Sequence, residues 1–589
     1  MPIKRVLLIE PKAPASHVYS LVRMPRLGLP LLGTKLKELG YEVSLIYGMG
    51  NEIRVADLRG VDLVGISTTT STCQEAYRIA RFARSRRIPV VLGGVHATFR
   101  PEEALEHCDY VCRGEADYTF AELLECLNRG EAPLNVPGVS FRYEGKYRHN
   151  PLPEWVDINE SPVPDLFLFK NVRISTYPVS TSRGCPFDCT FCSVTQMFGH
   201  RYRYRNTDLV LSELAQYKGK NVFISDDNFT ANPKRAKELL QGMIERDILP
   251  KWWGTQVRTD AARDDELLDL MRRANCGTVY VGMESVNSKT LEVYNKRQDL
   301  ADIELCVRKF HEYGIMVHGM FVFGSDDDTV STIRETVDFA LQNRIDTVQF
   351  LILVPLPGTP VYRQMEEENR LLTRDWNLYD GHHVVFRPAK MSPYELQMET
   401  EKAFKRFYSV RNTFKNLPVT GFRSVAFRSV GHYLVRKWLK ESSWYQEFLK
   451  KVSKEDQSMA GPMVSLRKTI ESFKIRRFRY LSTEKLVEMQ ISEKDGGILV
   501  DLQGYLNNFA LTEMIRTLKR NLPAYNQKLT VNAAKLGFAS EEVIKTFIQR
   551  LNALSGRFNI EVKVPDPEAL MRVLERYNLS IPHFECHSS

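Results

Sequence analysis

Short apolar runs alternate with amphipathic helical patterns through the first 125 residues. Buried strands are predicted at 5–9, 42–46, 62–66, 89–92 and 109–112, and helices at 30–39 and 73–86. Strands that are apolar throughout and separated by helices are typical of a parallel sheet with helices on both faces. We therefore predict an α/β domain with a doubly wound sheet over residues 1–125.

A second set of strands and helices fills residues 176–385, after a connector at 126–175. The connector has a hairpin signal around Glu144-Gly145, and the prolines that follow it indicate a stiff linker. Six strands are then predicted, at 179–181, 221–225, 252–257, 278–281, 316–323 and 347–354, with helices between them at 232–245, 264–273, 300–313 and 329–342. Six such units predict a partial (β/α)6 barrel, with functional residues at the carboxyl ends of the strands.

The last third of the chain divides into two further regions. Residues 386–485 are expected to be helical, with aromatic residues threaded among basic ones. Residues 486–589 are typical of a small α/β domain, with strands predicted at 497–502, 528–531 and 559–564 and helices at 512–520, 541–554 and 567–577. This domain is similar to the STAS fold and carries no catalytic constellation, so we interpret it as an interaction module.

Length and cysteine content place the chain among multidomain proteins of a reducing compartment. A chain of 589 residues is too long for one core, and ten cysteines are too few for a disulfide scaffold. The apolar run near the start is too short for a signal peptide, and no stretch of eighteen apolar residues is present to span a membrane. We expect a cytoplasmic location.

The net charge of +9 is concentrated in one segment. Residues 401–480 hold nineteen Lys and Arg against six Asp and Glu, so the rest of the chain is mildly acidic. The leading interpretation is that the aromatic faces pack on the barrel while Lys and Arg stay in solvent. The second is that these basic helices contact a membrane surface, which would make the protein peripheral at the membrane. Nucleic acid is a less favoured partner.

Three cysteines lie on one short loop near the start of the second domain. They are Cys185, Cys189 and Cys192, in the run Ser182-Arg-Gly-Cys-Pro-Phe-Asp-Cys-Thr-Phe-Cys-Ser193. A [4Fe–4S] cluster takes four ligands, so three converging thiolates would leave one iron open for chemistry. Phe191 would place an aromatic ring beside whatever binds the open iron.

Two other interpretations of these cysteines are weaker. Unrelated core cysteines are rarely gathered on a loop with Gly and Pro. A zinc site would need a fourth ligand, and the sequence shows no second C-x2-C and no paired histidines. The spacing C-x3-C-x2-C, with an aromatic residue before the last cysteine, resembles the cluster motif of the radical S-adenosylmethionine (radical SAM) superfamily.

The resemblance to radical SAM proteins covers residues 176–385 and implies where SAM binds. Besides Phe191, the implied positions are Asp226, Asp227 and Asn228 for the amino group and polar atoms, Arg258 for the carboxylate, Glu284 and Ser285 for the ribose, and Gly319 for the adenine. Two alternatives stay open. Asp226–Asn228 also suits a helix cap, and Arg258 also suits a surface ion pair.

Small and hydroxyl residues follow two strands of the N-terminal domain, at the edge where doubly wound sheets bind ligands. No G-x-G-x-x-G follows the first strand, which counts against a nucleotide dehydrogenase. Gly93-Gly94-Val-His96 and Arg113-Gly-Glu115 resemble the Rossmann-like cobalamin-binding domain that precedes many radical SAM domains. The resemblance implies these cobalamin-binding residues: Ser67, Thr68, Thr69, Gly93, Gly94, His96 and Glu115.

One departure from other cobalamin proteins concerns the cobalt ligand. The D-x-H-x-x-G motif, which supplies a histidine to cobalt in other cobalamin enzymes, is absent from this sequence. Our hypothesis is that cobalamin binds with its own base displaced and with no histidine on the cobalt. His17 and His96 are then loop or hydrogen-bonding residues.

Together these resemblances imply a cobalamin-dependent radical SAM enzyme with a [4Fe–4S] cluster, SAM and cobalamin as cofactors. Such an enzyme cleaves SAM to a 5′-deoxyadenosyl radical and here is expected to methylate an unactivated carbon of a small molecule or lipid. A one-electron reductant of the flavodoxin or ferredoxin type is expected as a partner. The alternatives are radical cyclisation, ring rearrangement or oxidation with the same cofactors, then tRNA methylthiolation, and a cobalamin-based sensor.

Overall fold

The computed structural model describes most of the chain, and it forms two compact units, Met1–Asp456 and Gln457–Ser589. The described residues are 2–13, 22–48, 53, 55–169, 172–415, 417–441, 443–458, 487–494, 497–506, 528–538, 547–549 and 559–563. His17, predicted not to bind cobalt, and the basic run at 475–480 lie outside them.

The N-terminal sheet is parallel over its first five strands, as predicted, and the order is β2-β1-β3-β4-β5-β6-β7. The parallel strands are β1 (Arg5–Glu10), β2 (Glu42–Tyr47), β3 (Leu63–Ser67), β4 (Val90–Gly93) and β5 (Tyr110–Cys112). The hairpin expected in the connector exists as β6 (Val139–Tyr143) and β7 (Lys146–His149), and β6 pairs antiparallel with β5. The connector therefore extends this sheet at one edge.

Both faces of the N-terminal sheet are buried, which explains its apolar strands. On β1, Leu7 and Ile9 belong to one apolar core while Val6 and Leu8 belong to another. The helices of the domain are α1 (Gly28–Glu38), α2 (Cys73–Arg84), α3 (Val95–Phe99), α4 (Pro101–Leu105) and α5 (Thr119–Asn128). Helices α1 and α5 contribute to the second core and α2 to the first, as the doubly wound pattern requires.

The second sheet is parallel throughout and runs in sequence order, β8-β11-β12-β13-β14-β15. Its strands are β8 (Tyr177–Val179), β11 (Asn221–Ile224), β12 (Trp252–Val257), β13 (Cys276–Glu284), β14 (Met316–Phe323) and β15 (Thr347–Ile352). The predicted six-strand alternation is therefore confirmed. A short antiparallel pair, β9 (Ser182–Arg183) and β10 (Arg203–Tyr204), stands beside it.

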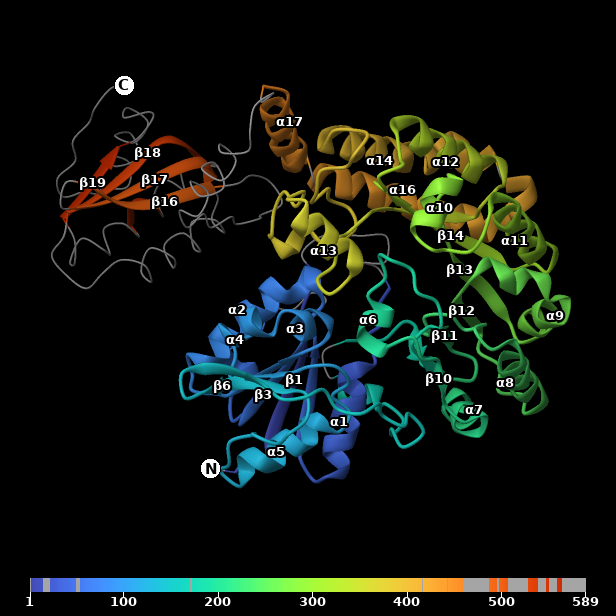
Figure 1. The fold of residues 1–589 in the computed structure, drawn as a ribbon, viewed down its shortest axis with the longest axis horizontal. Coiled ribbons are helices and arrows are strands. Elements are labelled where there is room, and N and C mark those ends of the chain that lie inside the picture. Colours follow the sequence, from blue (N-terminus) through green and yellow to red (C-terminus); the bar gives the residue numbers. More distant parts are fainter. Residues whose placement is uncertain are drawn as a thin grey trace. The chain divides into compact units, whose positions relative to one another are not determined.

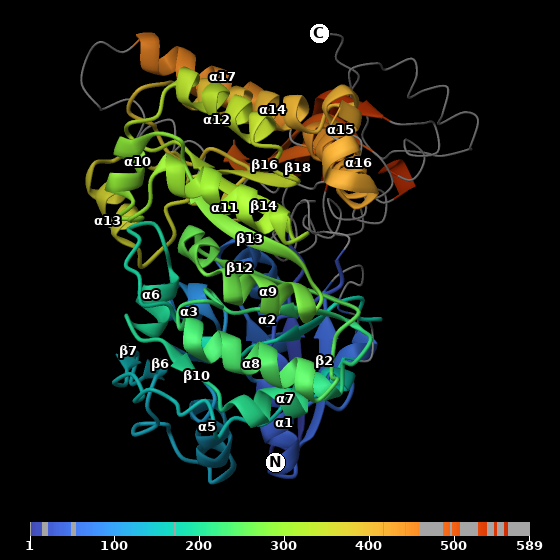
Figure 2. The same cartoon turned by 90° about the vertical axis from the view of Figure 1, so that its right-hand side faces the viewer.

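Helices cover the outer side of this second sheet (Figures 1 and 2). They are α7 (Thr207–Ala215), α8 (Pro233–Glu245), α9 (Asp265–Arg273), α11 (Leu300–Glu312) and α12 (Val330–Gln342), with shorter helices α6 (Val194–Phe198), α10 (Ser288–Val293) and α13 (Pro360–Glu367) at the strand ends. The remaining helices of the unit are α14 (Pro393–Phe407), α15 (Val410–Lys415), α16 (Leu417–Glu441) and α17 (Ser443–Ser458). None of the described helices is long and apolar enough to cross a membrane.

The aromatic residues of the basic segment divide between core and surface. Phe404, Phe407, Tyr408 and Trp438 are buried, and the Tyr408 hydroxyl donates to the carbonyl oxygen of Val348 in β15 at 2.6 Å. Some aromatic residues of the basic segment therefore pack on the second sheet, as one of the two interpretations predicted.

The C-terminal unit contains one described sheet, in the order β16-β17-β18-β19. Strands β17 (Gly497–Leu506), β18 (Lys528–Phe538) and β19 (Asn559–Lys563) are parallel to one another and match the three predicted strands. Strand β16 (Val487–Lys494) was not anticipated and pairs antiparallel with β17. The predicted helices 512–520 and 567–577 lie outside the described residues, and only 547–549 of the helix 541–554 is described.

A buried histidine–aspartate pair after the second sheet predicts a pH dependence of stability. His383 Nδ1 lies 3.0 Å from Asp380 Oδ1; burial acts to lower the pKa of His383, but the carboxylate outweighs burial and raises it. Burial likewise acts to raise the pKa of Asp380, but His383 lowers it below its usual value. We expect this contribution to unfolding free energy to be full below about pH 6.5 and to fall as pH rises through the folded-state pKa of His383.

Asp380 produces the dependence on the acidic side. Its contribution to the free energy of unfolding is present above about pH 4 and is lost as pH falls through its lowered pKa. Urea unfolding of the wild type and of Asp380→Asn across this range measures both limbs. The variant should be less stable and should lose the dependence on the basic side. Parallel pH profiles for the two proteins would contradict the assignment.

Candidate functional site

The cysteine loop begins directly after β9, and its backbone conformation depends on glycine. Gly184 has φ +84°, and a Cβ added there would clash with the carbonyl oxygen of Arg201. The Cys192 N–H donates to the Cys189 carbonyl at 3.1 Å, which closes a turn between the last two cysteines. The loop is therefore a defined structure that presents its thiols together.

The three thiols suit a cluster better than a single metal ion. All three are free and partly buried, and burial raises the pKa of Cys192 to about 12 and that of Cys185 above its usual value. Three thiols on one loop can each bind a different iron of a [4Fe–4S] cube, whereas a structural zinc site takes four protein ligands.

Aromatic and cationic side chains surround the cysteine loop. Phe191 packs edge-on against Tyr294, with ring centroids 4.8 Å apart. The Arg258 guanidinium lies 3.8 Å from the ring centroid of Phe187, inside the loop. Arg258 donates one hydrogen bond to the Lys296 carbonyl, while its buried Nε has no hydrogen-bond partner among the described residues. An unpaired, buried guanidinium nitrogen beside the loop fits the predicted carboxylate of SAM.

The acidic residues after β11 differ in their surroundings. Asp226 is fully buried and accepts hydrogen bonds from Thr181 N at 2.6 Å and from Ser182 N at 3.0 Å, so it holds the chain leading into the cysteine loop. Burial, together with the charge of Asp226, raises the pKa of Asp227 to about 6, opposed by the Gly184 N–H. Asn228 is buried and accepts from the Thr230 hydroxyl. The helix cap is Asn232, so capping by Asp226–Asn228 is not observed.

The predicted ribose and adenine residues are also held by protein contacts. Glu284 ends β13 with φ +62° and accepts from Lys296 Nζ at 2.6 Å, while Ser285 accepts from the Asn287 N–H. A Cβ on Gly319 would touch Met283, Ile345 and Phe321, so its missing side chain points into packed core. Any contact between Gly319 and adenine would therefore be through backbone.

One cavity joins the carboxyl ends of the N-terminal strands to the cysteine-loop domain. From the N-terminal domain it is lined by Ser67, Gly93, Gly94 and Glu115, all predicted cobalamin residues, and by Gly65 and Gly114. From the second domain it is lined by Ser182, Arg183, Met197, Phe198 and Asp227. Glycines at the ends of β4 and β5 let a bulky ligand approach backbone, so the residues present fit a corrinoid.

Three predicted cobalamin residues do not line this cavity. Thr68 hydrogen-bonds to the Gly93 carbonyl, and Thr69 caps the following turn. His96 lies in α3, which begins after Gly94, and is buried within reach of the Thr70 hydroxyl. His96 also packs on Trp376, with ring centroids 5.1 Å apart, and the Trp376 indole N–H donates to Glu103 at 2.7 Å. This contact joins the N-terminal domain to the segment after the second sheet.

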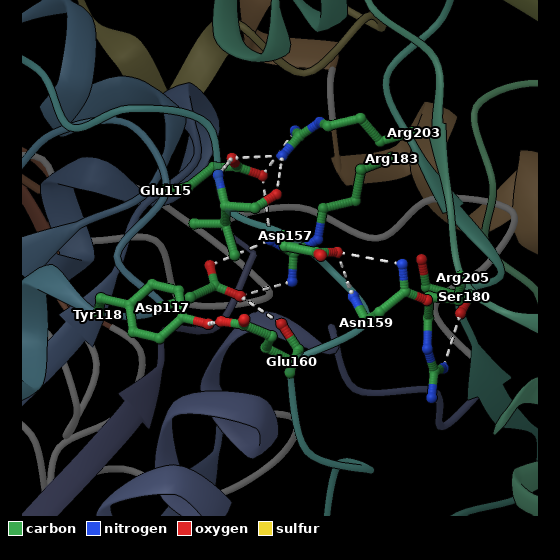
Figure 3. A network of polar contacts seen from close by, with 12 residues as sticks. Glu115, Asp117, Tyr118, Asp157, Asn159, Glu160, Ser180, Arg183, Arg203 and Arg205 are labelled. Atoms are coloured by element: carbon green, nitrogen blue, oxygen red, sulfur yellow. Dashed lines mark hydrogen bonds and ion pairs between the residues drawn. The ribbon is translucent and has the colours of Figure 1, made fainter.

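A buried ion network connects the two domains beside the cavity (Figure 3). Arg183, next to the cysteine loop, donates to Glu115 at 3.0 Å and to both oxygens of Asp117 at 2.7 and 3.0 Å. Arg203 donates twice to Glu115 at 2.8 Å. The Glu115 side chain is 4% exposed, and its carboxylate accepts hydrogen bonds from both arginines. The residue also lines the cavity. The sequence identified Glu115 but not its partners.

Polar residues on the inner face of the second sheet were also missed. The Tyr280 and His318 rings lie 4.8 Å apart, and His318 Nδ1 lies 2.8 Å from the Thr347 hydroxyl. Burial lowers the pKa of His318 to about 3, so it is neutral at physiological pH. Gln256 on β12 lies opposite Tyr280, and Gln349 lies on β15 two residues after Thr347; both are half-buried. Their alternation with apolar residues along each strand was the available signal.

Comparisons with known proteins agree with this geometry. The radical SAM superfamily model matches residues 179–340, and the B12 binding domain model matches residues 19–124. An uncharacterized methyltransferase of Pyrococcus horikoshii is 31% identical over 69% of this chain and 93% of its own. Bacteriochlorophyllide d C-12(1)-methyltransferase of Chlorobaculum tepidum is 31% identical over 66% of this chain and 84% of its own. The chain belongs to the family of cobalamin-dependent radical SAM methyltransferases.

Two more distant proteins extend the comparison. Hopanoid C-3 methylase of Methylococcus capsulatus is 27% identical over 69% of this chain and 80% of its own. The solved structure of the radical SAM methyltransferase TsrM from Kitasatospora setae, with cobalamin and a [4Fe–4S] cluster bound, has a TM-score of 0.57. It covers 74% of this chain and 99% of its own at 19% identity, which shows a common fold.

Proposed function

We propose that this cobalamin-dependent radical SAM enzyme methylates an unactivated carbon of a small, largely apolar molecule or lipid. The observation that carries the proposal is a cavity shared by the strand ends of the B12-binding sheet and the cysteine-loop domain. Asp227, one of the predicted SAM residues, lines this cavity beside the predicted cobalamin residues, so a methyl donor held on one wall would lie next to the cysteine-loop domain. Relatives named for bacteriochlorophyllide and hopanoid methylation support an apolar substrate class.

The residues have distinct proposed tasks. Cys185, Cys189 and Cys192 hold the cluster, Arg258 pairs with the SAM carboxylate, and Phe191 shields the open iron from water. Ser67, Gly93 and Gly94 leave space for the corrinoid against backbone. When bound, the three cofactors supply SAM cleavage by one electron and a transferable methyl group. The protein confines the substrate beside them and excludes water.

Other parts of the proposal concern partners and organisation. The electron comes from a flavodoxin or ferredoxin type of reductant. The C-terminal residues 486–589 act as a STAS-like docking module, and the second sheet forms a partial (β/α)6 barrel. No histidine binds the cobalt, which the direction of His96 supports for that residue.

Turnover of the anaerobically purified protein tests this function. The chain is reconstituted with iron, sulfide and cobalamin, supplied with SAM and reductant, and given bacteriochlorophyllide and hopanoid candidates. Mass spectrometry should find 5′-deoxyadenosine together with S-adenosylhomocysteine and a product heavier by one methylene. 5′-Deoxyadenosine without S-adenosylhomocysteine would point to cyclisation or rearrangement instead. Failure to bind cobalamin would overturn both.

A further inference from the structure

Helix α16 carries an unusual outward face that the proposed function does not use. Four large apolar side chains on it are exposed, Phe422 by 82%, Tyr433 by 61%, Phe427 by 50% and Val430 by 44%. Their spacing places them along one side of the helix. The preceding helix α15 adds Val410 and Phe414, each 57% exposed. Scattered exposed apolar residues are ordinary, but a contiguous stripe of them marks a contact surface.

The segment that forms this face carries only positive charges. Residues 407–440 contain seven Lys and Arg and no Asp or Glu. Arg423, Arg436 and Lys437 are exposed beside the apolar stripe, whereas Arg428 is fully buried on the opposite side. A surface with aromatic side chains at its centre and only positive charges around them is complementary to an anionic lipid surface.

The opposite side of α16 fixes which face points outward. The Arg428 guanidinium donates to the carbonyl oxygens of Asp346 at 2.7 Å, Ile345 at 2.5 Å and Asn412 at 3.1 Å. It also lies 4.4 Å from the ring centroid of Phe407. Val425, Leu434 and Trp438 are buried on this side. Because these contacts lock the rotation of the helix, the exposure of Phe422 and Tyr433 is set by the fold.

We propose that the outer face of α15 and α16 docks the enzyme on anionic membranes, with Phe422 and Tyr433 inserted among the lipid headgroups. The helix lies along the surface: its 25 residues span about 37 Å, and it does not qualify as a membrane-crossing helix. Dispersed charge favours encounter, and the aromatic rings retain the bound state. This surface is independent of the proposed reaction.

Vesicle flotation of the full-length protein tests the proposal without any turnover. Vesicles contain either phosphatidylcholine alone or phosphatidylcholine with phosphatidylglycerol, at about 0.1 M salt, where exposed charges still act over about 10 Å. The wild type should float with the anionic vesicles only. Phe422→Ser/Tyr433→Ser and Arg423→Glu/Arg436→Glu should each reduce the partition coefficient by at least about tenfold.

Matched variants elsewhere serve as controls. Phe167→Ser removes an aromatic residue that is 83% exposed in the turn Leu166–Leu168, and Lys234→Glu/Lys251→Glu reverses two exposed lysines around α8. Both controls should float like the wild type, and all variants should keep the cluster absorbance after reconstitution. The proposal is overturned if the wild type does not float, which is also the result expected if another protein surface covers this face. It is equally overturned if the α16 variants float as well as the wild type.

Discussion

Replacing Cys192 with alanine is expected to abolish the iron–sulfur cluster and all SAM cleavage. Only two thiolates would remain on the loop, one too few for the three irons that the protein is proposed to bind. The buried thiol of Cys192 has its pKa raised to about 12 by desolvation, so it becomes a thiolate only when metal is bound. Iron and acid-labile sulfide contents, with the electron paramagnetic resonance spectrum of the reduced protein, measure the effect.

The matched control for this variant is Cys306→Ala. Cys306 is completely buried in α11, far along the chain from the loop, and belongs to the apolar core. Its loss should reduce unfolding free energy by about 1 kcal/mol and leave the iron content unchanged. Full iron loading of Cys192→Ala, or equal loss in both variants, would refute the ligand assignment.

Replacing Arg183 with methionine is expected to destabilise the protein by about 3 kcal/mol and to weaken cobalamin binding. Asp117, whose side chain is 9% exposed, would lose both of its guanidinium hydrogen bonds and be left as a buried charge. Because Arg183 adjoins the cysteine loop, its loss would leave Arg203 as the remaining ion-pair partner of Glu115 from this segment. Chemical unfolding and cobalamin titration, both under anaerobic conditions, measure the two effects.

Two further variants separate this network from a general effect of losing an arginine. Arg272 pairs with Asp269 on the surface, with side chains 55% and 40% exposed, so Arg272→Met should change stability by less than about 1 kcal/mol. Asp117→Asn combined with Arg183→Met should recover part of the loss, since it removes the orphaned charge. Equal destabilisation by Arg183→Met and Arg272→Met would show that the network carries no special weight.

Sequence reasoning recovered the two sheets because short, largely apolar strands alternate with amphipathic helical patterns along both domains. It also placed the cysteine loop, since spacing along one loop is a local property. It failed where a role depends on a distant partner. Nothing near Arg183 in the sequence indicates that its charge is matched by Asp117 from the other domain. His96 is a second example, because its contact with Trp376 joins residues that lie far apart along the chain.

The basic helical segment shows a similar limit. The composition of this segment predicts helices with aromatic and basic residues, but Phe422 and Trp438 are both aromatic residues beside basic ones. Only the fold separates them, with Trp438 buried and Phe422 exposed. Composition was therefore compatible with packing on the sheet and with surface contact. In the structure, some of these aromatic residues are buried and others are exposed.

The contact of Trp376 with the N-terminal domain has a consequence for how this chain can be divided. Trp376 is 2% exposed, and it shares its surroundings with His96 and Glu103. The hairpin β6–β7 likewise completes the N-terminal sheet from the connector. Residues 1–125 transplanted alone would leave the edge of β5 without β6, and His96 and Glu103 without the tryptophan that covers them. A transplantable B12-binding module must carry the connector and a compatible residue at position 376.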